Sequence, residues 1–420
     1  MTSSSKARTE TLALYAVAWL VPAWVASYAR RTMRPYEVLE VPGYVPAQHP
    51  GLLGELLDAW QLWDGQWFLR IAADGYSAGD ASPAFLPLYP SLVHGVASVT
   101  VGDHVLAGCL VSWGAFLAAL HLLGKLFERE LPAEDARAAR LLLVAFPTAF
   151  YFHAAYTESL FLLLSVGAFL AARDGRFVVA GAAALGATAT RWTGIALGPL
   201  LLVEALHAAT ERSAGRALAG AELTPRGLLA AARSLPARIW AASLLPLTAL
   251  PLVCVYFDRT LGDPLAWTRA QRLWERRLAP PWTGLADGIR VLLPGNPPYL
   301  EPLEGGFPRL PFYGGGFLDA HGYNLVAALA GLGLSALALR HLRPAHALWA
   351  LAGVVIPLMT PSRLQPLQSM PRFLVVLFPL FMILAVLLRG RPVALAATLA
   401  GFALVQGFFV ARFALWYWVA

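Results

Sequence analysis

The sequence has little charge for its length, and this excludes a water-soluble globule. Only 14% of its 420 residues are charged, whereas 58% are hydrophobic. Soluble domains average about 25% charged residues. The apolar residues gather in runs close to the roughly 20 residues needed to cross a bilayer. Backbone polar groups in hydrocarbon must be satisfied within their own segment, so these runs predict helices. The expected fold is all-α and polytopic.

Lysine and cysteine are also scarce. Lys6 and Lys125 are the only lysines, so arginine supplies most of the positive charge. The net charge of +7 comes from arginines in short connections between apolar runs, as in loops at a membrane surface, and does not indicate nucleic-acid binding. Cys109 and Cys254 both lie inside apolar runs, which argues against a disulfide framework.

Several catalytic motifs are absent. There is no Walker A lysine motif, so an ATP-driven pump is unsupported. No Asp-x-Asp pair is present to hold a divalent metal on a nucleotide sugar, and no His-Glu-x-x-His motif supports a zinc protease. His341 and His346 fall in one predicted turn without further ligands. The sequence therefore predicts no metal site and no cofactor.

The apolar runs predict about 10–12 membrane spans. The first run follows Lys6 and Arg8 and is long for a signal peptide, so it is expected to be a retained anchor. Residues 85–101 contain two prolines and are expected either to span the bilayer or to lie half-buried at its surface. The predicted spans, which include this first run, are residues 11–29, 103–125, 141–156, 157–172, 177–190, 193–208, 239–257, 322–340, 345–360, 371–388 and 392–415.

The arginine distribution predicts the orientation of the chain. Short arginine-bearing loops mark the cytoplasmic side. The long connections 30–84 and 259–321 then lie outside the cytoplasm. Arg30, Arg31 and Arg34 run against this assignment, although the rule weights long loops less. Residues 153–158, 191–193 and 361–371 also fall on the outer side.

Neither long connection is large enough to count as a separate domain, so residues 1–420 are expected to form one integral membrane domain. The preference for arginine and alanine suggests a GC-rich bacterial genome, and hence the bacterial inner membrane.

The first outer connection carries a carboxylate between two tryptophans. Asp64 stands in the segment Trp63-Asp64-Gly65-Gln66-Trp67. Near a membrane surface, such a carboxylate is a candidate general base in a partly desolvated pocket. The alternative is an aromatic belt at the interface, with Asp64 as a helix N-cap.

Three further charged residues fall at the ends of predicted spans. A carboxylate such as Glu158 is energetically costly at the end of a span unless it is paired or near water. The alternative is that Glu158 is an acid in the first turn of the following helix, where it interacts with the helix dipole. Arg191 interrupts apolar sequence and is expected to pair with an anion such as Glu158, or to bind a phosphate. Arg372 occupies a similar boundary. For both arginines the alternative is snorkelling to lipid head groups.

The second outer connection combines tryptophans and arginines. Trp267 and Trp274 flank a run that continues to Arg276 and Arg277. This pattern is typical of an amphipathic helix lying on the membrane. The same residues can stack on a sugar and bind a lipid phosphate.

An ordered set of motifs extends over roughly residues 11–390. It comprises Trp63-Asp64-Gly65, Ile71-Ala72, Gly75-Tyr76, Pro87-Leu88-Tyr89-Pro90, Pro147, Tyr156 to Phe161, Arg191, Gly194, Gly262-Asp263-Pro264, Gln271, Trp274, Arg372-Phe373 and Phe378-Pro379. This set resembles the PIG-V-type mannosyltransferases, multi-spanning enzymes of the GT-C glycosyltransferase class. The chain departs from the pattern at Phe373, where Tyr is expected, and at Phe85-Leu86, where two Phe are expected.

The resemblance implies a lipid-phosphate-dependent glycosyltransferase, with a polyprenyl-phosphate sugar donor, mannose as the sugar, and the reaction on the extracytoplasmic face. The acceptor, a glycan, lipid or protein, stays open. Asp64 takes the place of the acidic residue that is the usual catalytic candidate in this class. It is expected to act as a base that deprotonates the acceptor hydroxyl, with inversion at the anomeric carbon. The residues expected to bind the donor phosphate and sugar are Arg191, Arg372, Arg276, Glu158, Tyr156, Tyr89, Trp63, Trp67, Gln271 and Trp274.

A secondary transporter or lipid flippase is the strongest competing interpretation from another class of protein. It predicts two related halves and polar residues near the bilayer midplane. No internal repeat is present, and the polar residues cluster near one predicted face, which favours an enzyme. The sequence is also compatible with an inactive membrane scaffold and with a transferase for a sugar other than mannose.

Overall fold

The fold is built from helices of very different lengths. The computed structural model describes residues 3–36, 41–215, 224–293, 320–363 and 365–419. Over these ranges no β-sheet is formed, which confirms the all-α prediction. Six helical segments of the described chain are long and apolar enough to cross a membrane. They are α1 (Ser3–Thr32), α5 (His104–Glu130), η4–α9 (Trp192–Ala214), α11–η6–α12 (Ala237–Leu261), α15 (Ala320–His341) and α19 (Pro392–Ala414).

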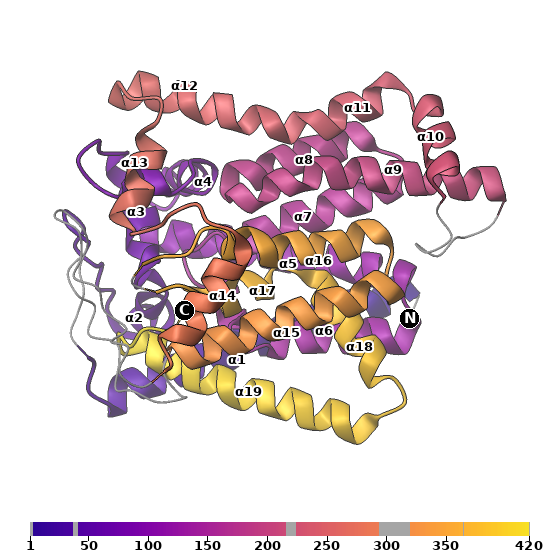
Figure 1. Cartoon of the computed structure of the whole chain (residues 1–420). Helices are drawn as coiled ribbons and strands as arrows, with labels where there is room; N and C mark the ends of the chain where they lie inside the picture. Colours follow the sequence, from indigo (N-terminus) through magenta and orange to yellow (C-terminus); the bar gives the residue numbers. More distant parts are fainter. Residues whose placement is uncertain (1–2, 37–40, 216–223, 294–319, 364, 420) are drawn as a thin grey trace.

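Most of the long helices run side by side (Figure 1). Phe116, Phe127 and Phe169 are fully buried in the largest apolar cluster, which joins the middle of the bundle. Within a bilayer the packing of such rings, and not removal of their surface from water, holds neighbouring helices together. The helices that complete the bundle are α6 (Ala133–Ala145), α7 (Glu158–Arg173), α8 (Phe177–Thr190), α16 (Pro344–Leu358), α17 (Met370–Val375) and α18 (Phe378–Leu388).

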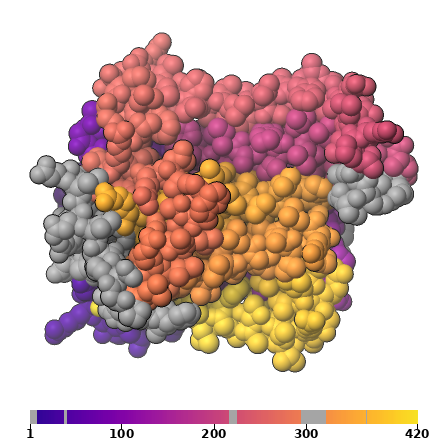
Figure 2. Space-filling model, in the orientation of Figure 1, coloured from indigo at the N-terminus to yellow at the C-terminus, as the bar shows by residue number. Residues whose placement is uncertain are grey.

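Short helices gather at one end of this bundle (Figure 1). They come from the two long connections and from the segment that follows the first of them. Helix α14 lies on the molecular surface against α15 and α16 (Figures 1 and 2). The short elements are α2 (Gly51–Leu57), η1 (Asp58–Gln61), α3 (Asp64–Asp74), η2 (Ser82–Ala84), α4 (Leu88–Ala97), α13 (Ala266–Leu273) and α14 (Pro281–Arg290). Helix α10 (Pro225–Ser234) lies at the other end, after α9.

The predicted span 141–156 is wrong as a continuous helix. Helix α6 ends at Ala145, and the chain then forms only the 3₁₀ turn η3 (Ala149–Phe152) before α7. Pro147 explains the break, because the residue before a proline is pushed out of the α conformation. Phe146 accordingly has an extended ψ of 140°. The break brings the chain from α6 into the short-helix end.

The predicted span 371–388 is also interrupted. Helix α17 ends at Val375 and α18 begins at Phe378. Pro379 stands in the first turn of α18, where its missing N–H and fixed φ are tolerated. Residues 85–101 contain only the 10-residue α4. Such a helix is about 15 Å long, half of a bilayer core of roughly 30 Å.

The short loops between the long helices lie at the end of the bundle opposite the short helices (Figure 1), and two of their arginines share Glu204. Arg173 pairs with Glu130 at 2.7 Å and with Glu204 at 3.3 Å. Arg343 reaches the same Glu204 at 2.9 Å and Glu211 at 3.1 Å. These contacts join α5, α7, α9 and α16. The grouping of these loops at one end agrees with the sidedness expected from the sequence.

Two of the three arginines that ran against the predicted orientation, Arg30 and Arg31, have carboxylate partners. Arg31 forms an ion pair with Glu55 of α2. The Arg30 side chain lies 3.8 Å from Asp58 and donates a hydrogen bond to the Gly54 carbonyl at 3.2 Å. Their charge is therefore partly compensated within the same connection.

Close helix packing gives a stability prediction. A Cβ added at Gly181 of α8 would lie 2.5 Å from the Ala242 carbonyl oxygen of α11, whereas one at Gly114 of α5 would meet nothing within 4 Å. Gly181→Ala should lower the free energy of unfolding by about 1–3 kcal/mol. Gly114→Ala should be neutral or stabilising, because alanine costs less backbone entropy. Thermal unfolding in detergent, followed by tryptophan fluorescence, measures both; equal shifts would contradict the packing described.

Candidate active site

Four charged side chains that are far apart in sequence meet at the short-helix end. Arg372 of α17 donates from Nη1 to Asp64 Oδ2 at 2.5 Å and from Nε to Glu158 Oε1. Arg191, between α8 and η4, donates to the same Glu158 oxygen at 2.8 Å. The pairs with Arg372 span 308 and 214 residues of sequence. The prediction that Arg191 pairs with Glu158 is thus confirmed by the geometry.

Burial differs across this charged cluster of Asp64, Glu158, Arg191 and Arg372. The Glu158 side chain is 0% exposed, that of Arg372 is 7% exposed and that of Asp64 is 17% exposed. Glu158 Oε2 has no hydrogen-bond partner among the described residues. A fully buried carboxylate requires compensating cations, and two arginines supply them. Asp64 is the carboxylate that solvent or a ligand can reach.

Aromatic rings fix the arginines in place. The Arg372 guanidinium carbon lies 4.7 Å from the ring centroid of Tyr156 and 5.3 Å from that of Tyr151. The Arg191 guanidinium carbon lies 5.0 Å from the Phe373 centroid. Cations over ring faces gain more when they are shielded from water. The aromatic residue after Arg372 therefore holds the other arginine of the cluster.

Tyr156 also fastens α3 against the start of α7. Its hydroxyl donates to the Leu62 carbonyl at 2.9 Å. The Ala155 N–H donates to the Trp60 carbonyl at 2.9 Å. Gly65 permits this approach, because a Cβ there would lie 3.2 Å from the Tyr156 ring. The segment that carries Asp64 is thus tied directly to the one that carries Glu158.

Backbone strain is concentrated around these charged residues. Trp63 has φ 59°, and Asp64 follows it as the first residue of α3. Glu275, with φ 55°, precedes Arg276, and Ser369, with φ 67°, is the N-cap of the helix that carries Arg372. Non-glycine residues rarely take such conformations, which cost of order 1–3 kcal/mol and concentrate at functional sites. The N-cap position is Trp63, not Asp64.

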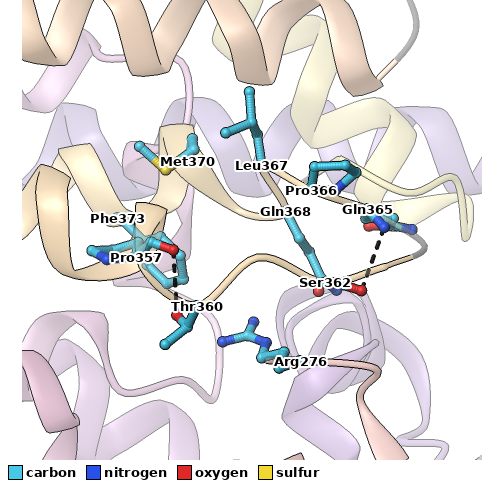
Figure 3. A pocket seen from close by; sticks show the side chains of 10 residues that line it. All are labelled: Arg276, Pro357, Thr360, Ser362, Gln365, Pro366, Leu367, Gln368, Met370 and Phe373. Atoms are coloured by element: carbon cyan, nitrogen blue, oxygen red, sulfur yellow. Dashed lines mark hydrogen bonds between the residues drawn. The ribbon is translucent and has the colours of Figure 1, made fainter. Parts of the chain in front are cut away.

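Arg276 lines a small pocket that has both polar and apolar members (Figure 3). The pocket also contains Thr360, Ser362 and Gln365 from the connection between α16 and α17. Burial, together with the charges of Arg372 and Arg191, lowers the pKa of Arg276 to about 10 against the opposite effect of Asp64. The guanidinium is therefore still charged at neutral pH. Gln365 Oε1 is buried without a hydrogen-bond partner among the described residues.

The second long connection is joined to the α16–α17 connection by its backbone. Arg276 and Ser362 form an antiparallel bridge. The Arg363 N–H donates to the Glu275 carbonyl at 2.9 Å, and the Ala279 N–H donates to the Met359 carbonyl at 2.9 Å. Thr148 donates to the Pro371 carbonyl at 2.9 Å, which anchors the start of α17. These contacts tie the segment that carries Arg276 to the connection that leads into α17.

Residues 41–49 of the first long connection are held against η1 and α3. Gln61 accepts from the Ala47 N–H at 2.9 Å, and Gln66 accepts from the Val41 N–H at 2.7 Å. His49 lies between Asp58, at 2.6 Å, and Asp103, at 2.9 Å. Burial acts to lower the pKa of His49, but the hydrogen bonds to the two aspartates outweigh it and raise the pKa.

The structure places the predicted tryptophans mainly in aromatic packing. Trp67 is 3% exposed and stacks on Phe85, and Trp274 packs against both rings. Trp63 packs against Trp416 and Trp418, at centroid distances of 5.7 and 5.2 Å. These contacts occupy much of the ring surface that was expected to face a sugar.

Two other predicted residues form hydrogen bonds with groups outside the charged cluster. Tyr89 is fully buried, and its hydroxyl donates to the Gly108 carbonyl at 3.0 Å and bonds with Ser112. The Gln271 backbone carbonyl accepts from the Arg276 N–H at 3.0 Å. Trp267, which the sequence suggested as part of a membrane-surface helix, packs against Trp192 next to Arg191, with 4.9 Å between ring centroids.

Sequence reasoning missed several residues around the site. Tyr151 lies five residues before the recognised Tyr156 and shares Arg372 with it. The polar side chains of Ser362 and Gln365 stand in a connection read only as an outer turn. Trp416 and Trp418 lie beyond the range of the motifs. The closeness of Tyr151 to the recognised Tyr156 in the chain is the one signal of these contacts that the sequence carried.

An apolar groove of about 490 Å³ lies between α4, α8 and α12. Leu88, Leu185 and Leu252 line it, with Ser91 and Tyr256 as polar members. Val253 belongs both to the groove and to a small apolar cluster with Tyr76, Trp192 and Trp267. Through Trp192, this cluster connects the groove with the neighbouring Arg191.

Comparison with known families gives a match within the first half of the chain. The family model Mannosyltransferase (PIG-V) matches residues 32–197, a range that includes Asp64, Glu158 and Arg191. The resemblance seen in the motifs is thereby confirmed over that range. A comparison with curated proteins finds no match.

Two kinds of solved structure are similar to the chain. ArnT from Cupriavidus metallidurans, bound to undecaprenyl phosphate, is 17% identical with a TM-score of 0.49; the match covers 97% of this chain and 68% of that one. The oligosaccharyltransferase AglB from Archaeoglobus fulgidus, in complex with an inhibitory peptide and a dolichol-phosphate, is 14% identical with a TM-score of 0.43. That match covers 97% of this chain but only 56% of the archaeal enzyme.

The buried ion pairs give a second prediction. Glu158→Gln leaves Arg372 and Arg191 without their buried counter-charge, so the free energy of unfolding should fall by about 3–5 kcal/mol. Glu134→Gln, at the exposed start of α6, is the matched control and should change stability by less than about 0.5 kcal/mol. Thermal unfolding of both variants in the same detergent tests this; a Glu158→Gln variant as stable as the control would show that the cluster is not structural.

Proposed function

We propose that this chain is a membrane glycosyltransferase that transfers mannose from a polyprenyl-phosphate donor to an acceptor hydroxyl, on the extracytoplasmic face of the bacterial inner membrane. The observation that carries the proposal is the cluster in which Asp64 faces Arg372, Glu158 and Arg191. The mannosyltransferase family match covers three of these four residues. The acceptor is a glycan, a lipid or a protein.

The chemistry assigned to Asp64 is general-base catalysis. Its carboxylate takes the proton of the acceptor hydroxyl as the acceptor oxygen bonds to the anomeric carbon of the donor. The bond from that carbon to the phosphate oxygen breaks, and the polyprenyl phosphate leaves with the electron pair. Attack opposite the leaving group inverts the anomeric configuration. Asp64 suits this role because it is the partly exposed carboxylate of the cluster.

The negative charge that develops on the leaving phosphate requires nearby cations. Arg372 and Arg191 form one group of donors, and Arg276 approaches from the second long connection. Among the described residues no carboxylate forms an ion pair with Arg276, and Asp64 is the carboxylate whose charge acts on it. Planar guanidinium groups match phosphate oxygens in pairs, which is why arginine suits this task.

The apolar groove is assigned to the isoprenoid tail of the donor. It opens between α4, α8 and α12 and continues toward Trp192, next to Arg191. A donor lying in it has its apolar chain among leucines and alanines and its phosphate near the arginines. The tail enters the groove from lipid and not from water, so its binding depends on van der Waals packing against the groove wall. Membrane lipids would fill the groove when no donor is bound.

Replacement of Asp64 tests the proposed reaction. Asp64→Asn keeps the size of the side chain but cannot take a proton, so transfer should fall by about 10²–10⁴-fold. Asp74→Asn, at the exposed end of the same helix, is the control and should transfer at the wild-type rate. The assay is label transfer from polyprenyl-phosphate-mannose to cell-envelope acceptors. Undiminished transfer by Asp64→Asn would refute the assignment.

A bulky substitution tests the groove. Ala182→Trp should fill part of it and raise KM several-fold for a long-chain donor, with kcat little changed, because the ring displaces the tail rather than the reacting atoms. The effect should be smaller for a farnesyl-phosphate sugar. Ala400→Trp, exposed on α19, is the control. Equal KM values for wild type and Ala182→Trp with the long-chain donor would rule the groove out as the tail site.

A further inference from the structure

Arg372 is shared between two carboxylates of unequal accessibility. Its Nε contacts Glu158, whose side chain is 0% exposed, and its Nη1 contacts Asp64, whose side chain is 17% exposed. Glu158 is also fixed by Arg191 at 2.8 Å. Of the two carboxylates, Asp64 is therefore the one that an incoming anion can displace.

The charge of the site favours such an exchange. Asp64 and Glu158 contribute two negative charges, whereas Arg191, Arg276 and Arg372 contribute three positive charges. The excess charge stands at Arg276, which lies close enough to Asp64 and Arg372 for their charges to act on its guanidinium. A phosphate attracted to Arg276 presents oxygens to Arg372 with the same geometry as a carboxylate.

Pairing with Arg372 also limits what Asp64 can do as a base. An oxygen that accepts a charge-assisted hydrogen bond at 2.5 Å has a lone pair committed to that bond. A general base must instead lie within hydrogen-bond reach of the proton that it removes. In the arrangement seen here, Asp64 Oδ2 is directed at Arg372.

We propose that the donor phosphate, when it binds, takes the place on Arg372 that the Asp64 carboxylate occupies in this structure. Donor binding then releases Asp64 toward the acceptor hydroxyl, so that the base becomes available only in a donor-loaded enzyme. This inference rests on the proposed function and adds an order of events to it: donor first, acceptor second. Phosphate and carboxylate exchange on one guanidinium, and no covalent bond changes in this step.

The groups that face Asp64 come from every surrounding element. Arg372 contacts it from α17, Tyr151 and Tyr156 come from the segment before α7, and Arg276 and Arg191 act through their charges. Glu158 lies behind Arg372. Among these groups the arginines alone are able to exchange a carboxylate for a phosphate.

The test is the affinity for undecaprenyl phosphate, measured by isothermal titration of the purified full-length chain in nanodiscs. Asp64→Asn removes the internal competitor, so it should bind undecaprenyl phosphate about tenfold more tightly than wild type. Asp64→Ala should show the same gain, which guards against a folding defect peculiar to one variant. Asp74→Asn should bind as wild type does. A merely structural Asp64 would give unchanged or weaker binding when replaced.

The outcomes separate this inference from the proposed function. If both Asp64 variants fail to transfer sugar but bind undecaprenyl phosphate no better than wild type, the exchange on Arg372 is overturned and the base assignment stands. If Asp64→Asn transfers sugar at the wild-type rate, the proposed function itself fails. Tighter binding with lost transfer supports both.

Discussion

The buried negative charge of Glu158 is the constraint on which the arrangement of the site depends. A carboxylate without solvent contact is costly unless cations and hydrogen bonds compensate it. Arg191, 33 residues after Glu158, and Arg372, 214 residues after it, meet that requirement. Because Arg372 still has donors to spare, it also reaches Asp64. The position of the proposed base thus follows from the compensation of a different carboxylate.

The sequence was enough to predict a helical membrane fold. It was also enough to predict that the charged residues of the site lie together at one end of the helices. Apolar runs identify membrane helices well, because the bilayer leaves few alternatives for the backbone. The positions of Asp64, Glu158, Arg191 and Arg372 at span boundaries correctly suggested one shared face. Pro147 and Pro379 also carried the signal for the two helix breaks, and the predicted spans overlooked it.

The sequence alone does not show which residues contact each other when they are far apart in the chain. Trp67 and Trp274 are of the residue type that stacks on sugars, but in the structure they pack against each other and against Phe85. Tyr89, inside a recognised motif, bonds to the backbone of α5 instead of the charged cluster. Aromatic residues satisfy core packing and ligand stacking equally well, so their type does not decide their role.

The ion pairs around Glu204 have a mechanical consequence for the far end of the bundle. Through Arg173 and Arg343 they fasten α5, α7, α9 and α16 to one another at a single level. That level fixes the spacing of these four helices, so a tilt of any of them about it moves the opposite end farther than this one. For the 18-residue α9, about 27 Å long, a tilt of about 5° moves the free end by roughly 2 Å. A movement of that size is comparable to the difference between a closed ion pair and an open one.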